Sequence, residues 1–300
     1  MKNDNLKKIK TIVTHNGNFH TDEVFACAAL SIFHDGEVEI IRSRNPEVWA
    51  TGDYVVDVGG VYDAGMGRFD HHQEGGAGKR ENDIPYSSLG LVWKEFGERL
   101  TGSAYAVRMV DERLVQPVDA GDNGFETFGV HKDVSPFILQ DVVSVFRPAW
   151  DEKRTEDEGF FEAVDIAKKI LAREILRTRS EEEGKRYAEE SYARAEDKRI
   201  IVLDDHYPWY EALCAKPEPL YVVKPDRGNM GKWKIEAVRN FAHTFKNRKD
   251  MPSAWAGKTG AEFAEISGVP DAIFCHNKLF VAVAGSKEGA LALAHKAVEN

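Results

Sequence analysis

The sequence contains little cysteine and no long apolar segment. Cys27, Cys214 and Cys275 are far apart and form no Cys-x-x-Cys pair, so we expect neither a disulfide framework nor a zinc ribbon. The longest apolar run, VFACAALSIF, is about half as long as a helix that spans a bilayer. The opening residues, MKNDNLKKIK, lack the apolar core of a signal peptide. These absences predict a cytoplasmic protein of a reducing compartment that does not enter a membrane.

The chain also lacks the excess of basic residues that proteins coating nucleic acids carry, because its net charge is −10. Residues 1–196 contain 25 Lys and Arg against 37 Asp and Glu, a net charge of −12, whereas residues 197–300 have a net charge of +2. Within residues 216–258 the net charge reaches +6. An acidic first part suits metal binding and a locally basic second part suits a phosphate-bearing ligand, although ordinary surface charge explains the same distribution.

Short apolar runs alternate with helical patterns in the first part of the chain. This alternation predicts a mainly parallel sheet covered by helices on both faces. Strands are expected at KTIVTH (10–15), VEIIRSR (38–44), DYVVDVG (53–59) and GRFDHH (67–72), and helices at 22–33, 87–97 and 103–116. In the helix at 22–33, Phe25, Ala28, Ala29 and Ile32 would form one apolar face.

A charged helix at about 159–196 follows, and we interpret it as the connector between two domains. Its apolar residues at helical spacing are Phe161, Val164, Leu171 and Ile175. Beyond it, strands are expected at IIVLD, LYVVK, WKIEAV, AIFCH and LFVAVAG, with a last helix from Ser286. The predicted fold is therefore α/β, with a domain at 1–196 that includes the connector helix and a smaller α+β domain at 197–300.

The stretch HNGNFHTDE, residues 15–23, places two histidines and two acids between the first strand and the first helix. Thr21 before Asp22 and Glu23 fits a helix N-cap followed by acids in the first turn. That interpretation leaves His15 and His20 unexplained.

Further polar groups follow other strands at equivalent positions. Asp57 ends the third strand, Asp70, His71 and His72 end the fourth, and Asp122 lies in the turn-rich segment DAGDNG. Each has an ordinary explanation as a turn former or a chance pair. Ligands of parallel sheets, however, bind outside the carboxyl ends of the strands, and four groups at such ends predict a site there. Imidazole and carboxylate without thiolate favour an ion such as Mn²⁺ over structural zinc.

These residues carry a resemblance to known families. The triplet Asp70-His71-His72 after a strand, with Asp57 before it, resembles the DHH phosphoesterase superfamily. The ordered motifs THNGNFHTDE, FDHHQ, DAGDNG, WAG, SGVPDAIFCHN and SKEGALALA resemble the MYG1 family (UPF0160) from residue 14 to residue 294. The resemblance implies a two-domain, metal-dependent hydrolase, with 3′–5′ RNA exonuclease activity ascribed to the eukaryotic members of the family.

The resemblance also implies roles for the matching residues. Asp57 would bridge two ions, and the wider superfamily usually has Asp where this chain has His20. Asp70 would orient a neighbouring histidine, and His72 would face the substrate phosphate. Asp122, directly before Asn123-Gly124, is preferred to Asp119 as the ligand of the DAGDNG segment. Two Mn²⁺ ions are expected, with Mg²⁺ or Co²⁺ as alternatives, and the implied ligands are His15, His20, Asp22, Asp57, His71 and Asp122.

Charge on a substrate phosphate must be met by fixed cations or hydrogen-bond donors. His276, in a turn between two expected strands, resembles the place where DHH C-terminal domains contact phosphate, but it also fits a plain hairpin turn. Trp209 and Trp255 could stack on a base, although packing in the core is the favoured role. The candidate substrate-binding residues are Arg42, Arg44, Lys232, Lys234, Arg239 and His276.

Three functional hypotheses follow. The preferred one is a metal-dependent phosphodiesterase that acts on short single-stranded RNA through a metal-activated water. The second is a metallohydrolase of a dinucleotide, a cyclic nucleotide or pyrophosphate, and the third is a non-catalytic nucleotide-binding protein. The expected partner is thus RNA or a small phosphate compound and not a membrane, and a homodimer remains one option for the assembly.

Overall fold

The computed structural model describes residues 9–125, 127–129, 132, 134–228, 231–241 and 244–300. The chain divides into two compact units, Met1–Arg179 and Ser180–Asn300. This division falls within the long helix α7 (Glu156–Arg194), whereas the boundary expected from the sequence lies two residues after it. The prediction that the opening residues, MKNDNLKKIK, form no signal peptide concerns a segment that lies largely outside the described residues. Among the described helices, none has both the length and the apolar character needed to cross a membrane.

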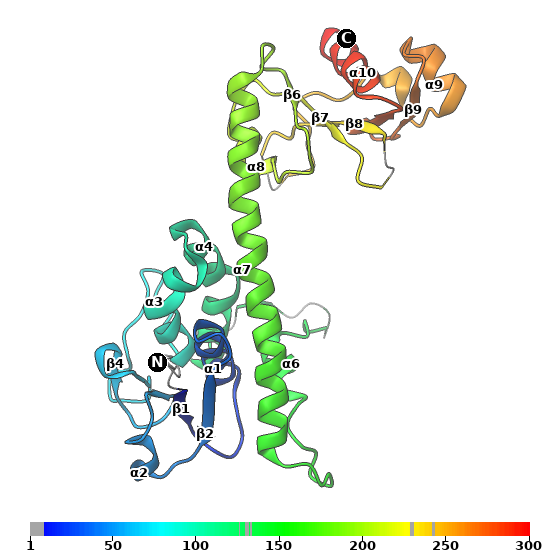
Figure 1. Cartoon of the computed structure of the whole chain (residues 1–300). Helices are drawn as coiled ribbons and strands as arrows, with labels where there is room; N and C mark the ends of the chain where they lie inside the picture. Colours follow the sequence, from blue (N-terminus) through cyan, green and yellow to red (C-terminus); the bar gives the residue numbers. More distant parts are fainter. Residues whose placement is uncertain (1–8, 126, 130–131, 133, 229–230, 242–243) are drawn as a thin grey trace, which may run out of the picture. The chain divides into compact units, whose positions relative to one another are not determined.

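A mainly parallel sheet organises the first unit (Figure 1). Its strand order is β2-β1-β3-β5-β4, and only the β4–β5 pair within it is antiparallel. The predicted α/β class and the mainly parallel sheet are therefore confirmed. The strands are β1 (Lys10–Thr14), β2 (Val38–Arg42), β3 (Tyr54–Val56), β4 (Tyr62–Asp63) and β5 (Arg68–Phe69).

Helices cover this sheet and bury its apolar side chains. The sequence predicted one apolar face for the first helix, but its residues from Val24 to Leu30 are fully buried all round. The reason is that α1 contacts both β3 and α3 and thus lies in the core. The helices are α1 (Thr21–Phe33), α2 (Pro46–Trp49), α3 (Ser88–Thr101), α4 (Ala104–Val110), α5 (Gln116–Asp122) and α6 (Leu139–Ser144).

The helix expected to end near residue 116 continues through a π-helical turn, Asp111–Val115, into α5. Asp122 therefore ends a helix and does not stand in an open turn. The turn-forming residues of DAGDNG remain helical up to Asp122 because tertiary hydrogen bonds hold the segment. The buried Asp119 carboxylate accepts from the Ser87 hydroxyl and the Gly90 amide.

The N-cap of α1 is one residue earlier than expected. Thr21 is the first helical residue, and His20 occupies the cap with extended backbone. The Glu23 carboxylate accepts the His20 backbone N–H at 2.7 and 2.9 Å. The cap thus fixes the point at which the His20 side chain leaves the helix.

The second unit is built on a mixed sheet with the order β6-β7-β8-β10-β9, in which β6 and β7 are parallel and the other pairs are antiparallel. This agrees with the predicted α+β pattern. Trp209 and Trp255 are buried in its cores, so core packing is confirmed for both. The elements are β6 (Ile200–Val202), α8 (Tyr210–Cys214), β7 (Tyr221–Pro225), β8 (Trp233–Ala237), α9 (Gly260–Ser267), β9 (Ala272–Cys275), β10 (Val281–Ala284) and α10 (Lys287–Glu299).

The first turns of α7 are anchored by Arg42, which the sequence assigned to substrate. Its guanidinium donates to Asp157 at 2.6 Å and to the Gly17 carbonyl at 2.5 Å. It also stacks 4.5 Å over the ring of Phe160, and the Arg42 side chain is 1% exposed. These contacts engage two nitrogens of the guanidinium, whereas its Nε has no hydrogen-bond partner among the described residues, so the assignment of Arg42 to phosphate binding stays a prediction.

The buried aromatic residue of this helix also differs from expectation. Phe160 is fully buried, whereas Phe161 is 43% exposed. Phe160 packs in the core edge-to-face against Phe19, and Arg42 stacks on its ring.

We expect Arg42→Gln to lower the free energy of unfolding by about 2 kcal/mol, because a charge-assisted hydrogen bond and the stacking on Phe160 are lost together. Arg44→Gln is the matched control, since Arg44 is exposed, and should change stability by less than about 0.5 kcal/mol. Chemical denaturation of both variants measures the difference. Equal stability of the two would contradict the anchoring role.

Candidate metal centre

Side chains from several elements converge at the carboxyl edge of the first sheet. His15 follows β1, Asp57 follows β3, and His71 comes two residues after β5. The ends of α1 and α5 face the same edge. The structure brings together all the ligands proposed from the sequence, namely His15, His20, Asp22, Asp57, His71 and Asp122.

One group forms around His15. Its Nε2 lies 3.2 Å from Asp57 Oδ2 and 3.1 Å from Glu23 Oε1. With His20 these residues can each offer one ligand atom, and the four atoms all lie within 4.8 Å of one another. The group therefore has the composition and the spacing of a divalent metal site.

A second group forms around His71. Its Nε2 lies 3.3 Å from Asp57 Oδ1, 3.2 Å from Asp122 Oδ2 and 3.9 Å from Asp22 Oδ2. Asp57 thus presents one carboxylate oxygen to each group. That is the arrangement required of a bridging ligand.

The backbone of Asp57 is held in the left-handed region, with φ of 57°. This conformation is uncommon outside glycine, and Asp and Asn adopt it more readily than most residues. The Asp57 amide is fixed by donating to the Phe69 carbonyl at 3.0 Å. Strain held in place by neighbouring structure is typical of functional residues.

Three buried atoms in the cluster lack a hydrogen-bond partner among the described residues: Asp22 Oδ1, Asp57 Oδ1 and His71 Nε2. The last two lie close together but without hydrogen-bond geometry. Buried polar atoms are almost always hydrogen-bonded, so three such atoms at one place need another partner. Oxygen and imidazole nitrogen atoms directed to a common point fit a divalent cation.

The carboxylates repel one another strongly in this buried site. Burial and the charge of Asp57 raise the pKa of Asp22 above its usual range. Burial also raises the pKa of Glu23 to about 8, and burial with nearby Asp22 raises that of Asp122 to about 8. Glu23 and Asp122 therefore retain protons at neutral pH unless other positive charge is supplied.

Two of the three histidines of the cluster have raised pKa values and so favour the charged form, whereas burial lowers the pKa of His20. Burial disfavours their charged forms, but hydrogen bonds to Asp57 and Glu23 raise the pKa of His15 to about 10. For His71, burial is the largest single effect and lowers the pKa, but the neighbouring carboxylates of Asp57, Asp22 and Asp122 together raise it to about 9. Burial raises the pKa of Asp57, yet the two histidines lower it to about 2. Protons therefore supply the positive charge that divalent ions would supply, which is a second indication of fit.

Asp70 and His72 form a separate pair at the rim. Asp70 Oδ1 lies 2.8 Å from His72 Nδ1, and Asp70 Oδ2 accepts the Gly60 amide at 2.5 Å. The His72 side chain is 62% exposed. Asp70 therefore orients His72 towards solvent.

Asp119, the alternative to Asp122, lies elsewhere. Its carboxylate binds Arg80 at 2.7 Å together with Ser87 and Gly90. These contacts occupy both of its oxygens. The structure thus brings Asp122, and not Asp119, to the cluster.

Two cavities open onto the cluster, and His20 and His72 line both. One, of about 420 Å³, is lined by Arg44, whose guanidinium lies 3.2 Å from His15 Nδ1. The other, of about 570 Å³, is lined by Arg147, which donates to the Phe19 carbonyl. Each of these two cavities therefore offers one arginine beside the cluster.

The remaining basic candidates lie in the second unit and do not form one group. Arg239 and His276 line a common cavity. Lys234 instead binds Glu236 at 2.7 Å, and Lys232 lies outside the lining of that cavity. The His276 Nδ1 accepts the Lys278 amide at 3.1 Å, as a turn histidine does.

The whole chain matches one known family. The sequence profile of a family described as "Uncharacterised protein family (UPF0160)", with the short name MYG1_exonuc, matches residues 11–298. The chain belongs to the MYG1 family. A MYG1 protein of Schizosaccharomyces pombe is 29% identical, covering 98% of this chain and 99% of the relative. A protein of Homo sapiens named MYG1 exonuclease is 30% identical (94% and 84%), and a MYG1 protein of Chlamydia pneumoniae is 32% identical (93% and 93%).

Two residues of this MYG1-family site were missed from the sequence. Glu23 was interpreted only as a first-turn acid, and it does bind the cap while also facing His15. A signal existed, because acids at the start of a helix that follows a ligand-bearing loop point back to that loop. Arg147 had no comparable signal, since it lies 76 residues after His71 and is brought in by the chain beyond α6.

We expect Asp22→Asn to stabilise the metal-free protein at neutral pH. The raised pKa of Asp22 means that its contribution to stability is present below about pH 4 and is lost as pH rises through its folded pKa. Asn removes that loss and can still accept from the Ser88 amide and hydroxyl. Thermal unfolding in EDTA should show a gain that widens with pH, about 3 °C for each kcal/mol of repulsion removed.

The same variant should lose most of the stabilisation that Mn²⁺ gives the wild type. A wild type that gains nothing from Mn²⁺, or a variant that gains as much, would contradict the assignment of Asp22 as a ligand.

Proposed function

We propose that this chain is a metal-dependent exonuclease that degrades short single-stranded RNA in the 3′–5′ direction, with a first unit related to the DHH phosphoesterases. The observation that carries the proposal is the pair of histidine–carboxylate groups that share Asp57. Two groups sharing one carboxylate are typical of two-metal hydrolases of phosphodiesters. Support also comes from the mammalian relatives named MYG1 exonuclease.

Each group of ligands would hold one of two metal ions. His15, His20 and Glu23 would hold one ion, and Asp22, His71 and Asp122 the other, with Mn²⁺ as the proposed metal. When bound, such ions supply a water of lowered pKa and offset the charge that develops on the phosphate. Asp57 sets the relation between the two groups, because its backbone conformation and its amide hydrogen bond fix both carboxylate oxygens.

Residues at the rim would act on the substrate directly. The hydrogen bond that the His72 imidazole donates to the Asp70 carboxylate raises the pKa of His72, so the imidazole is charged over a wider pH range. A charged His72 can bind a non-bridging oxygen or donate a proton to the leaving oxygen. Arg44, exposed beside His15, is placed to bind a phosphate of the same strand.

The assay that tests this function uses 5′-labelled and 3′-labelled oligoribonucleotides with Mn²⁺, Mg²⁺ or Co²⁺, beside dinucleotides and pyrophosphate. We expect stepwise shortening of the 5′-labelled RNA from its 3′ end. Asp57→Asn, which tolerates the left-handed backbone, and His71→Gln should each lower turnover by at least about a hundredfold, because even outer-shell partners of a metal are worth 10–100-fold. Near-normal turnover in either variant at saturating metal would sink the assignment. Cleavage restricted to dinucleotides or pyrophosphate would replace RNA with a small phosphate substrate.

A pH profile tests the role of Asp70. If protonated His72 is required, activity falls as pH rises through the pKa of His72, which Asp70 raises. We expect Asp70→Asn to move this basic limb of kcat to lower pH, and His72→Gln to remove the limb and lower kcat by about 100-fold or more. A basic limb at the same pH in wild type and Asp70→Asn would show that His72 is not the group observed.

A further inference from the structure

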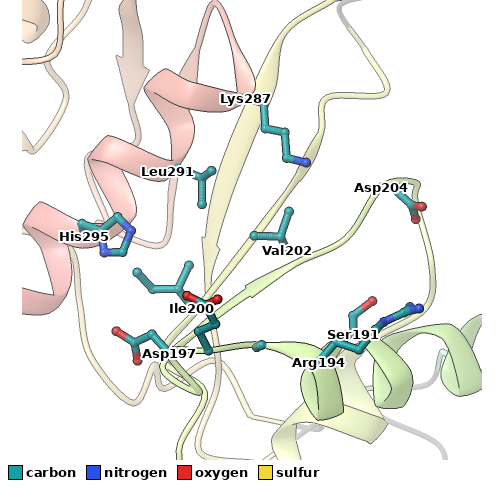
Figure 2. Close-up of a pocket in the computed structure, with 11 residues that line it drawn as sticks. Ser191, Arg194, Asp197, Ile200, Val202, Asp204, Lys287, Leu291 and His295 are labelled. Atoms are coloured by element: carbon teal, nitrogen blue, oxygen red, sulfur yellow. The ribbon is translucent and has the colours of Figure 1, made fainter.

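Among the described residues of the second unit, two of the cavities differ in their chemistry. The first, of about 480 Å³, has an apolar floor that includes Ile200, Val202 and Leu291 (Figure 2). Its rim carries the carboxylates of Asp197 and Asp204 as well as cations (Figure 2). Asp197 is offset by Arg199 at 2.7 Å, but the described lining contains no Phe, Tyr or Trp side chain on which a base could stack, so this cavity is less suited to a nucleic-acid strand.

The second cavity, of about 600 Å³, lies where α8, β8 and the turn between β9 and β10 meet. Basic and aromatic side chains dominate its lining. Its aromatic and cationic residues are Tyr210, Arg239, Phe245, His276, Lys278 and Phe280.

These side chains form two groups in contact. The Arg239 guanidinium lies 4.8 Å from the ring centre of Tyr210 and 4.9 Å from that of Phe245. The rings of His276 and Phe280 have centres 4.5 Å apart. Phe245 is nevertheless 90% exposed and Phe280 is 38% exposed. Both groups therefore leave aromatic surface open for a further flat group.

The charge around the cavity favours an anionic ligand. Arg239 and the exposed Lys278 contribute positive charge. The single acid in the described lining, Glu236, is offset by Lys224 at 2.9 Å and Lys234 at 2.7 Å. Lys234 thus acts indirectly, because it neutralises a carboxylate that would otherwise repel phosphate.

We propose that this cavity binds single-stranded nucleic acid by stacking bases on Phe245 and Phe280, with Arg239 and Lys278 beside the phosphates. Exposed aromatic side chains interleaved with cations are the recurring basis of single-strand binding without strong sequence preference. The ligand is the RNA of the proposed function, but the binding itself involves none of the metal ligands. It should therefore persist in EDTA.

The test measures binding of a labelled single-stranded oligoribonucleotide of about ten nucleotides to the full chain in EDTA by fluorescence anisotropy. We expect Phe245→Ala to weaken binding about tenfold, the loss of one stacked base, and Phe245→Trp to restore it. Phe241→Ala is the matched control, because Phe241 is 71% exposed in the same segment and is not part of the cavity lining. An abasic oligomer of the same length should bind wild type and Phe245→Ala equally, because it offers no base to stack.

Several outcomes would overturn the proposal: unchanged affinity in Phe245→Ala, an equal loss in Phe241→Ala, an equal loss with the abasic oligomer, or no binding of the wild type. The proposed function fails separately. If the wild type binds RNA through Phe245 but does not shorten it with any metal, the binding site stands and the exonuclease proposal falls. If the wild type shortens RNA but Phe245→Ala does not change the affinity, the exonuclease proposal stands and the binding site at Phe245 falls.

Discussion

The first unit depends on one electrostatic constraint, the burial of four carboxylates within a few ångströms of two histidines. Asp22, Glu23, Asp57 and Asp122 cannot all be ionised there without compensating positive charge. The raised pKa values of three of them and of His15 and His71 mean that bound protons can supply this charge as divalent ions would. Such a cluster destabilises the fold that carries it. The surrounding structure must therefore hold the cluster together by packing and hydrogen bonds elsewhere.

That support is visible in the elements that carry the ligands. Helix α1, which bears Asp22 and Glu23, is fully buried along most of its length, and the Ser88 amide and hydroxyl hold Asp22. The parallel strands β1 and β3 place His15 and Asp57 at one edge in fixed register. The left-handed backbone conformation of Asp57 is also unfavourable in free energy, and the same packing and hydrogen bonds hold it in place.

Much of this could be predicted from the sequence because parallel sheets impose a simple rule. Polar residues at the ends of consecutive apolar runs must meet at one edge, so His15, Asp57 and His71 could be placed together without coordinates. What could not be predicted depends on contacts between distant segments. The α5 helix extends to Asp122 because Asp119 is bonded to Ser87 and Gly90, and Arg42 turns inward because Phe160 and Asp157 come from α7. Neither partner is visible from local propensity.

The ion pairs of the basic residues also indicate which cations can bind a substrate strand. A cluster of carboxylates repels a polyanionic strand at a distance, so a substrate needs cations that structural ion pairs have not already consumed. In the first unit Arg42 forms an ion pair with Asp157, and Arg80 forms ion pairs with Asp111 and Asp119. Arg44 and Arg147 line the cavities at the cluster. In the second unit Lys224 and Lys234 form ion pairs with Glu236, whereas Arg239 and Lys278 line the aromatic cavity. Under the proposed function, affinity for a strand therefore arises mainly from residues away from the ligand cluster, and the cluster itself is reserved for one phosphate.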